Sequence, residues 1–220
     1  MDRPEIVRIS PVATRSCHEA VAFIDRDLVQ RKAYDAGRSP RRRDIHVFHR
    51  GDEDPLQRML NAIQPGSYIR PHRHLDPPKS ESVILLQGML GHVSFRDDGT
   101  PEDDSFLLLD LDRGVLGCDI RPGVWHTIFA LVPDTVIFEV KPGPYSPAND
   151  KDFAPWAPEE FIPASPDHGL PAPGRSLASA AFLAKIEDAF RRLWGLPPRS
   201  WQLPATATLQ IPGQTQSLES

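Results

Sequence analysis

The chain has 220 residues, a formal net charge of −5 and a pI near 5.9, with 40% hydrophobic and 25% charged residues. These values are ordinary for a soluble globular domain, and they give no global attraction to nucleic acid or to an anionic membrane. Apolar runs such as 83–86 and 106–109 are far too short to span a bilayer. Cys17 and Cys118 are the only cysteines, and the N-terminus MDRPEIVRIS lacks the apolar segment of a secretory signal, so we expect a cytoplasmic protein.

The first predicted element is a helix over residues 16–36. Ser16 and Glu19 have the spacing of a capping box, and Gly37 is a suitable end. The apolar positions that keep helical spacing are Val21, Ile24, Leu28 and Val29. Residues 1–43 are therefore predicted to form an N-terminal segment that contains one helix.

Residues 44–145 change to short alternating or apolar runs, which are separated by turn pairs such as Pro65-Gly66 and Pro133-Asp134. The runs that we interpret as strands cover 45–49, 58–63, 67–74, 82–87, 90–96, 105–110, 115–120, 126–131 and 135–141. About eight or nine short strands in one segment are typical of an all-β sandwich or barrel. The sequence therefore predicts a barrel domain over 44–145.

The C-terminal third is rich in proline, and residues 146–201 are predicted to form an irregular extension that contains a second helix. This helix runs from Ser176 to Trp194, with an apolar face, two arginines in its last turn and Gly195 after it. Residues 202–220 carry almost no charge and no apolar periodicity, which predicts a disordered tail.

The strongest chemical signal is a histidine pair, His72 and His74, in a predicted strand. Side chains two apart on a strand point to the same face, so the two imidazoles form a chelate. Glu81 opens the next apolar run, where an unpaired buried carboxylate would be costly and a metal ion supplies a partner. His126 follows the turn at Pro122-Gly123 and enters another strand.

Any one of these histidines is more often a surface or hydrogen-bonded residue than a ligand. The combined spacing of His72, His74, Glu81 and His126 is much harder to obtain by chance. Three neutral imidazoles and one carboxylate suit a divalent transition metal ion such as Fe, Zn, Mn, Ni or Cu, with one or two positions left open. The sequence therefore predicts one metal site, without fixing which metal.

Four more residues are candidates for the surroundings of the metal. Tyr68 and Arg70 have the strand parity of the histidine pair, so both are candidate substrate-binding residues, although Arg70 at the rim could simply be solvated. Glu139 and Lys141 share one face of the last predicted strand and are candidate catalytic residues for proton transfer. A structural ion pair across the sheet is the alternative for these two.

These residues resemble the two motifs of the cupin superfamily. Gly66, His72, His74, Glu81 and Gly88 are similar to the first motif, with a longer gap than usual before Glu81. The residues similar to the second motif are Pro122, Gly123 and His126, where the proline directly precedes the glycine and Ala130 replaces a common asparagine.

The chain also resembles one branch, the WbuC-type cupin-fold metalloproteins, over about residues 15–160. The segments that carry this likeness are 39–43, 49–50, 58–62, 65–68, 71–74 and 138–145. The resemblance implies a small β-barrel. With the two helices predicted above, the expected fold class is mainly β, namely a single cupin barrel (a double-stranded β-helix or jelly roll) with flanking N- and C-terminal helices. The resemblance also implies four metal ligands and, for some members, genes of polysaccharide biosynthesis nearby, but it implies no known reaction.

Two functions remain open at this point. The first is a metal-dependent enzyme that acts on a small polar or anionic metabolite, such as a sugar or sugar derivative, by isomerase, epimerase or dioxygenase chemistry. The second is a non-catalytic cupin that binds or senses a metabolite in the same pocket. Either way we expect a small-molecule ligand, no nucleic-acid or membrane partner and, by analogy with other cupins, a homodimer.

Overall fold

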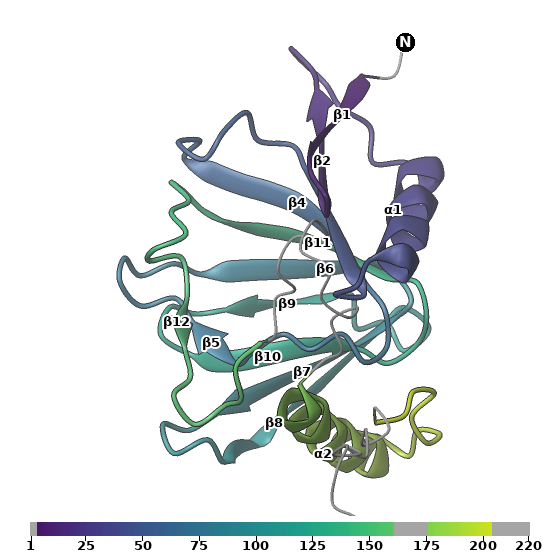
Figure 1. Cartoon of the computed structure of the whole chain (residues 1–220), viewed down its shortest axis with the longest axis vertical. Helices are drawn as coiled ribbons and strands as arrows, with labels where there is room; N and C mark the ends of the chain where they lie inside the picture. Colours follow the sequence, from purple (N-terminus) through teal and green to yellow (C-terminus); the bar gives the residue numbers. More distant parts are fainter. Residues whose placement is uncertain (1–3, 161–175, 204–220) are drawn as a thin grey trace, which may run out of the picture.

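The computed structural model describes residues 4–160 and 176–203, in which twelve strands and two helices are found (Figure 1). The elements are β1 (Glu5–Ser10), β2 (Ala13–Cys17), α1 (Arg26–Arg38), β3 (Arg43–Val47), β4 (Leu56–Ile63), β5 (His72–Arg73), β6 (Glu81–Gln87), β7 (Met89–Phe95), β8 (Pro101–Asp110), β9 (Gly117–Ile120), β10 (Trp125–Ala130), β11 (Thr135–Pro142), β12 (Asp152–Phe153) and α2 (Leu177–Trp194). Neither helix is long and apolar enough to cross a membrane.

Two sheets form the walls of a barrel. One has seven strands in the order β1-β2-β3-β4-β11-β6-β9, and the other has five in the order β12-β5-β10-β7-β8. Figure 1 shows α1 beside the seven-stranded sheet and α2 against the five-stranded sheet. Strand pairs in the described residues are antiparallel apart from β2 with β3, which run parallel. The predicted fold, a single cupin barrel with flanking helices, is confirmed.

Alternation along the strands divides the side chains between the inside and the outside of the barrel. On β4, Leu60 and Ala62 point outward and pack under α1 with Leu28 and Val29. Asn61 and its neighbours of the same parity point inward. One part of the interior is filled by a buried apolar cluster that contains Ile63, Val83, Leu85, Leu90, Leu109, Ile128, Ala130 and Ile137. The rest of the interior is available for a site.

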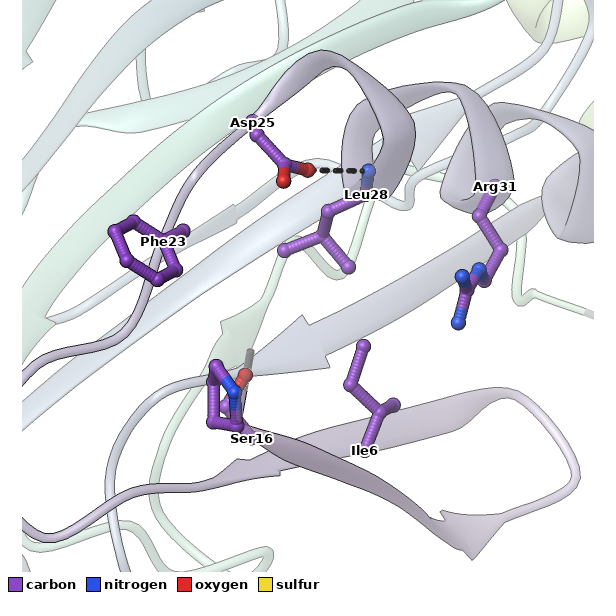
Figure 2. Close-up of a pocket in the computed structure, with 7 residues that line it drawn as sticks. Ile6, Ser16, Phe23, Asp25, Leu28 and Arg31 are labelled. Carbon is purple, nitrogen blue, oxygen red and sulfur yellow. Dashed lines mark hydrogen bonds between the residues drawn. The ribbon is translucent and has the colours of Figure 1, made fainter. Parts of the chain in front are cut away.

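The N-terminal helix begins ten residues later than predicted, at Arg26 instead of Ser16. Ser16 lies in β2, and its hydroxyl hydrogen-bonds with the ring of His46 at 2.8 Å, so pairing between strands overrides the local capping pattern. The actual cap is Asp25, whose carboxylate accepts a hydrogen bond from the backbone N–H of Leu28 at 2.9 Å (Figure 2). The apolar spacing before the cap is therefore not a helix face.

The C-terminal helix agrees with the prediction. Ser176 caps its first turn, and Gly195 ends it in the left-handed conformation with φ of 64°. The Phe190 ring is fully buried against Phe129, Phe106 and Trp194, with ring centroids 5.3 to 6.4 Å apart. These contacts attach α2 to the outer face of the five-stranded sheet. Residues 204–220, most of the predicted tail, lie outside the described residues.

Replacing Phe190 by Ala removes a buried ring from this contact, and we expect the free energy of unfolding to fall by about 3–5 kcal/mol. Leu193→Ala is the matched control, because Leu193 is 67% exposed on the same helix and its loss should change stability by about 0.5 kcal/mol or less. Urea unfolding followed by circular dichroism measures both. Equal effects of the two changes would contradict this packing.

A buried polar network lies under α1. His46 is fully buried and hydrogen-bonds with Thr14 and Ser16, while the ammonium group of Lys32 donates to Thr14 and pairs with Asp44. Burial, with a smaller contribution from the Lys32 charge, lowers the pKa of His46 from 6.5 to about 4. The imidazole is therefore neutral in the folded protein well below pH 6.5.

This network predicts an acid sensitivity. Between the two pKa values of His46, about 6.5 unfolded and about 4 folded, only the unfolded chain binds the proton, so stability falls as pH falls. We expect His46 to contribute a loss of about 2 kcal/mol between about pH 7 and pH 5. Chemical unfolding of the parent and of His46→Gln at both pH values tests this, because glutamine hydrogen-bonds without titrating. Parallel losses in the two proteins would contradict it.

Candidate metal centre

The structure brings the four predicted ligand residues together inside the barrel. The side chains of His72, His74, Glu81 and His126 are all buried, and one possible ligand atom from each lies within 4.8 Å of the others. His72 on β5 is the cross-strand partner of His126 on β10, and Glu81 begins β6 on the facing sheet. Both barrel walls therefore contribute to one small volume.

The turn that precedes His126 is attached to the histidine pair. Gly123 has a φ of 81°, a backbone conformation that favours glycine, and its N–H donates to the carbonyl of His74 at 3.0 Å. The turn at Pro122-Gly123 thus sets where β10 starts, and so where His126 lies relative to His74.

Each imidazole is oriented by a backbone carbonyl. The Nδ1–H groups of His72 and His126 donate to the carbonyls of Arg70 and Val124, each at 2.9 Å, and Nδ1–H of His74 donates to the carbonyl of Asp150. A carbonyl can only accept, so these bonds place a proton on Nδ1 of each ring, and Nε2 is the nitrogen that a neutral ring offers to a metal ion. Such bonds are typical of metal-ligating histidines.

The electrostatics also fit a cation. Glu81 Oε2 lies 3.0 Å from Nε2 of His74 and 3.8 Å from Nε2 of His126. Burial acts to raise the pKa of Glu81, but hydrogen bonds with His126 and His74, together with the charges of His126 and His72, hold it well below its usual range. Burial also lowers the pKa of His72, and its Nε2 is buried without a hydrogen-bond partner in the described part of the chain. A neutral imidazole beside a carboxylate is the state that a divalent transition metal requires.

A cavity of about 650 Å³ opens beside this cluster. His72, Glu81 and His126 lie in its wall, and so do three of the predicted pocket residues, Arg70, Glu139 and Lys141. The cavity therefore holds room for a small molecule next to the four residues.

Tyr68 is the exception among the predicted pocket residues. Its ring belongs to the apolar cluster under α2, near Phe182, and its hydroxyl donates to the carbonyl of Pro158 at 2.7 Å. Tyr68 would share the face of His72 only if 67–74 formed one strand, whereas β5 contains only His72 and Arg73. The substrate-binding role of Tyr68 stays a prediction, but its side chain is not among those that line the cavity.

Glu139 and Lys141 form a polar wall beside the cluster. Asn61 donates to Oε2 of Glu139, and the ammonium group of Lys141 lies 3.9 Å from Oε1 of Glu139 and 2.7 Å from Asp150. Burial and the charge of Glu81 raise the pKa of Glu139 to about 7. Burial acts to lower the pKa of Lys141, but Glu139 and Asp150 raise it above its ordinary value, so Lys141 stays charged.

Asp150 and Lys151, which were not predicted from the sequence, also line the cavity. They enter the site because β12 pairs with β5, with Phe153 opposite His72. A two-residue strand after a proline-rich loop leaves no periodic signal. Burial and the charge of Lys141 lower the pKa of Lys151.

His92 lies in the barrel interior beside the candidate metal centre. Its ring stacks on that of His126, with 6.0 Å between ring centroids, and burial lowers the pKa of His92 to about 4.

A second, smaller hollow of about 240 Å³ lies between the β1–β2 hairpin and the start of α1 (Figure 2). Ile6, Phe23 and Leu28 give it apolar walls, and its carboxylate, Asp25, already caps the helix. The group of possible metal ligands in the described residues lies elsewhere, so the larger cavity is the candidate functional site.

One family model matches part of this chain, and several solved structures are similar to about half of it. The family model "Domain of unknown function (DUF6016)" matches residues 24–107, which contain three of the four candidate ligands. No curated protein matches the chain. The WbuC-type assignment stays a prediction.

Three solved structures illustrate the likeness. The capsular polysaccharide assembling protein CapF from Staphylococcus aureus is 20% identical, with a TM-score of 0.39 and coverage of 50% of this chain and 28% of its own. KdgF from Halomonas sp. is 15% identical, with a TM-score of 0.36 and coverage of 48% and 82%. L-ribose isomerase from Geodermatophilus obscurus is 16% identical, with a TM-score of 0.39 and coverage of 52% and 70%. The chain thus spans less than a third of CapF.

The geometry predicts that His74→Ala loses metal. Changes to groups that only orient a ligand cost about 10–100-fold in metal affinity, so the loss of a ligand should cost at least as much. Elemental analysis after loading with Zn²⁺ and dialysis measures the ion retained per chain. His18→Ala is the control, because His18 lies in the loop before α1 and is not in the ligand group. Stoichiometric metal in His74→Ala would exclude this centre.

Proposed function

We propose that the protein is a metal-dependent enzyme that acts on a small anionic metabolite, such as a sugar derivative, by moving a proton on carbon. The observation that carries the proposal is a carboxylate in the cavity wall, Glu139, beside a cluster suited to a divalent ion. A metal held by His72, His74, Glu81 and His126 would polarise a carbonyl or hydroxyl oxygen of the substrate.

Glu139 suits the role of the base. Its Oε2 is held by Asn61, which leaves Oε1 as the oxygen that takes the proton from the carbon next to a carbonyl. A carboxyl group with a pKa of about 7 can both accept and return a proton near neutral pH. Returning that proton to the former carbonyl carbon, while the hydroxyl proton of the first carbon passes to the carbonyl oxygen, gives an aldose–ketose isomerase. Protonation of the same carbon by water from the opposite face gives an epimerase.

Lys141 and Arg70 would bind rather than transfer protons. Lys141 is fixed by Asp150 and stays charged, so it can hold an anionic or hydroxyl oxygen of the substrate and stabilise negative charge that develops beside Glu139. Arg70 lines the same cavity. A structural ion pair between Glu139 and Lys141 remains the simpler alternative, and in that case the pocket would bind or sense a metabolite without catalysis.

Proton exchange with solvent distinguishes these functions. The Mn²⁺- or Zn²⁺-loaded protein is incubated in D₂O with a panel of aldoses, ketoses and their phosphates, and NMR measures deuterium at the carbon next to the carbonyl. We expect exchange with at least one compound, and a loss of about 100-fold or more in Glu139→Gln with unchanged metal content. Saturable binding of a panel compound without exchange would favour the sensing function, and exchange that is equal in Glu139→Gln would exclude Glu139 as the base.

A further inference from the structure

Three guanidinium groups gather on one side of the cavity. Arg41, Arg43 and Arg70 all line it, and they face two consecutive carboxylates, Glu159 and Glu160. Arg43 is positioned by hydrogen bonds from its Nη1 to the carbonyl of Tyr68 and the hydroxyl of Ser67. The group is therefore built into the barrel wall and is not a set of loose surface side chains.

One carboxylate oxygen occupies the centre of this group. Oε1 of Glu160 accepts from Nε and Nη2 of Arg41, at 3.0 and 2.8 Å, and from Nη2 of Arg43. Paired guanidinium groups of this kind match the oxygens of a carboxylate or a phosphate. Glu160 comes from the segment after β12, so the chain places its own anion against the cavity wall.

Positive charge is left over after this pairing. Glu159 is 89% exposed and its Oε1 is 4.0 Å from Nη1 of Arg70, so it neutralises Arg70 only weakly. The Nε of Arg70 is buried and has no hydrogen-bond partner among the described residues. Arg15, on the same cavity wall, likewise has a buried Nε without a partner in 4–160 or 176–203. Buried donors are normally satisfied, so these groups indicate a missing acceptor.

We propose that Arg41, Arg43 and Arg70 form a subsite for the phosphoryl group of a phosphorylated metabolite, and that Glu160 fills the subsite until the ligand displaces it. Three cations suit a phosphoryl group, with a charge near −2, better than a carboxylate. The inference deepens the proposed function, because the subsite shares the cavity with the metal centre. The carbonyl of Arg70 also accepts from His72, so the two regions are adjacent along the chain.

Titration with inorganic phosphate tests the subsite. Calorimetry measures the affinity of the full chain for phosphate at constant ionic strength, once with and once without a metal chelator. The same titration with acetate gives the affinity for a carboxylate. We expect phosphate to bind more tightly than acetate, with or without the chelator. Affinity should fall about 10-fold in Arg41→Gln and Arg43→Gln, since each loses a charged hydrogen-bond partner. Glu160→Gln should bind phosphate about 10-fold more tightly, because the competing carboxylate is gone.

Arg199→Gln is the matched control. Arg199 also pairs with a carboxylate, that of Asp188, but it does not line the cavity, so phosphate affinity should not change. Thermal unfolding confirms that each variant folds. Three results would overturn the proposal and make the cluster a structural ion pair. The first is phosphate binding to Glu160→Gln that is weaker than or equal to binding to the parent. The others are no phosphate binding to the parent, and acetate binding as tight as phosphate binding. Because the chelated arm needs no metal, this result is independent of the metal centre and of the exchange assay.

Discussion

The barrel buries three imidazoles and a carboxylate close to one another. Burying these polar groups is costly unless each has a partner. Residues 4–160 and 176–203 supply partners for Nδ1 of all three rings but none for Nε2 of His72. The orientation of His74 depends on the loop at Asp150, and that of His126 on the Pro-Gly turn. Much of the surrounding architecture thus acts to keep four ligand atoms aimed at one point.

Because buried polar groups need partners, polar and apolar side chains occupy different parts of the barrel interior. Ile63, Val83 and their neighbours fill one part with apolar side chains, while Glu139, Lys141 and the arginines line the other. Charged groups can persist there because they are paired, as Lys141 is with Asp150 and Arg43 with Glu160. A ligand that enters the cavity must replace or extend these pairs, which favours oxygen-rich anions over apolar molecules.

Local patterns in the sequence were sufficient for the barrel and for the four candidate ligands. His72, His74, Glu81 and His126 each lie in or beside a strand whose alternation could be read directly, and Ser176 and Gly195 marked the ends of α2. In the N-terminal segment, Ser16 had an equally good local pattern for a cap. It was wrong because His46, thirty residues away along the chain, supplies a competing hydrogen bond.

Other parts of the site depend on contacts that no local pattern encodes. Tyr68 lies an even number of residues from His72, which would put both side chains on one face of a continuous strand. The backbone between them is not a strand, so this spacing does not predict where the Tyr68 side chain points. Asp150 and Lys151 immediately precede β12, and the short pairing of β12 with β5 brings them to the site. Glu160 meets Arg41 and Arg43 across more than a hundred residues of chain. Such long-range pairings follow from the closed barrel, not from sequence spacing.

The residues after α2 have a practical consequence for anyone who shortens this chain. Trp201 is buried, and its indole N–H donates to Glu187, a carboxylate with no exposed surface that also holds Arg191. Arg191 in turn donates to the carbonyl of Leu131, at the end of β10. Secondary structure alone would suggest a truncation at the end of α2. Such a truncation would remove Trp201, so Glu187 would lose the hydrogen bond from the indole N–H. The buried pair of Glu187 and Arg191 would then border the space that the indole ring fills. Expression trials should therefore retain the polypeptide through Leu203.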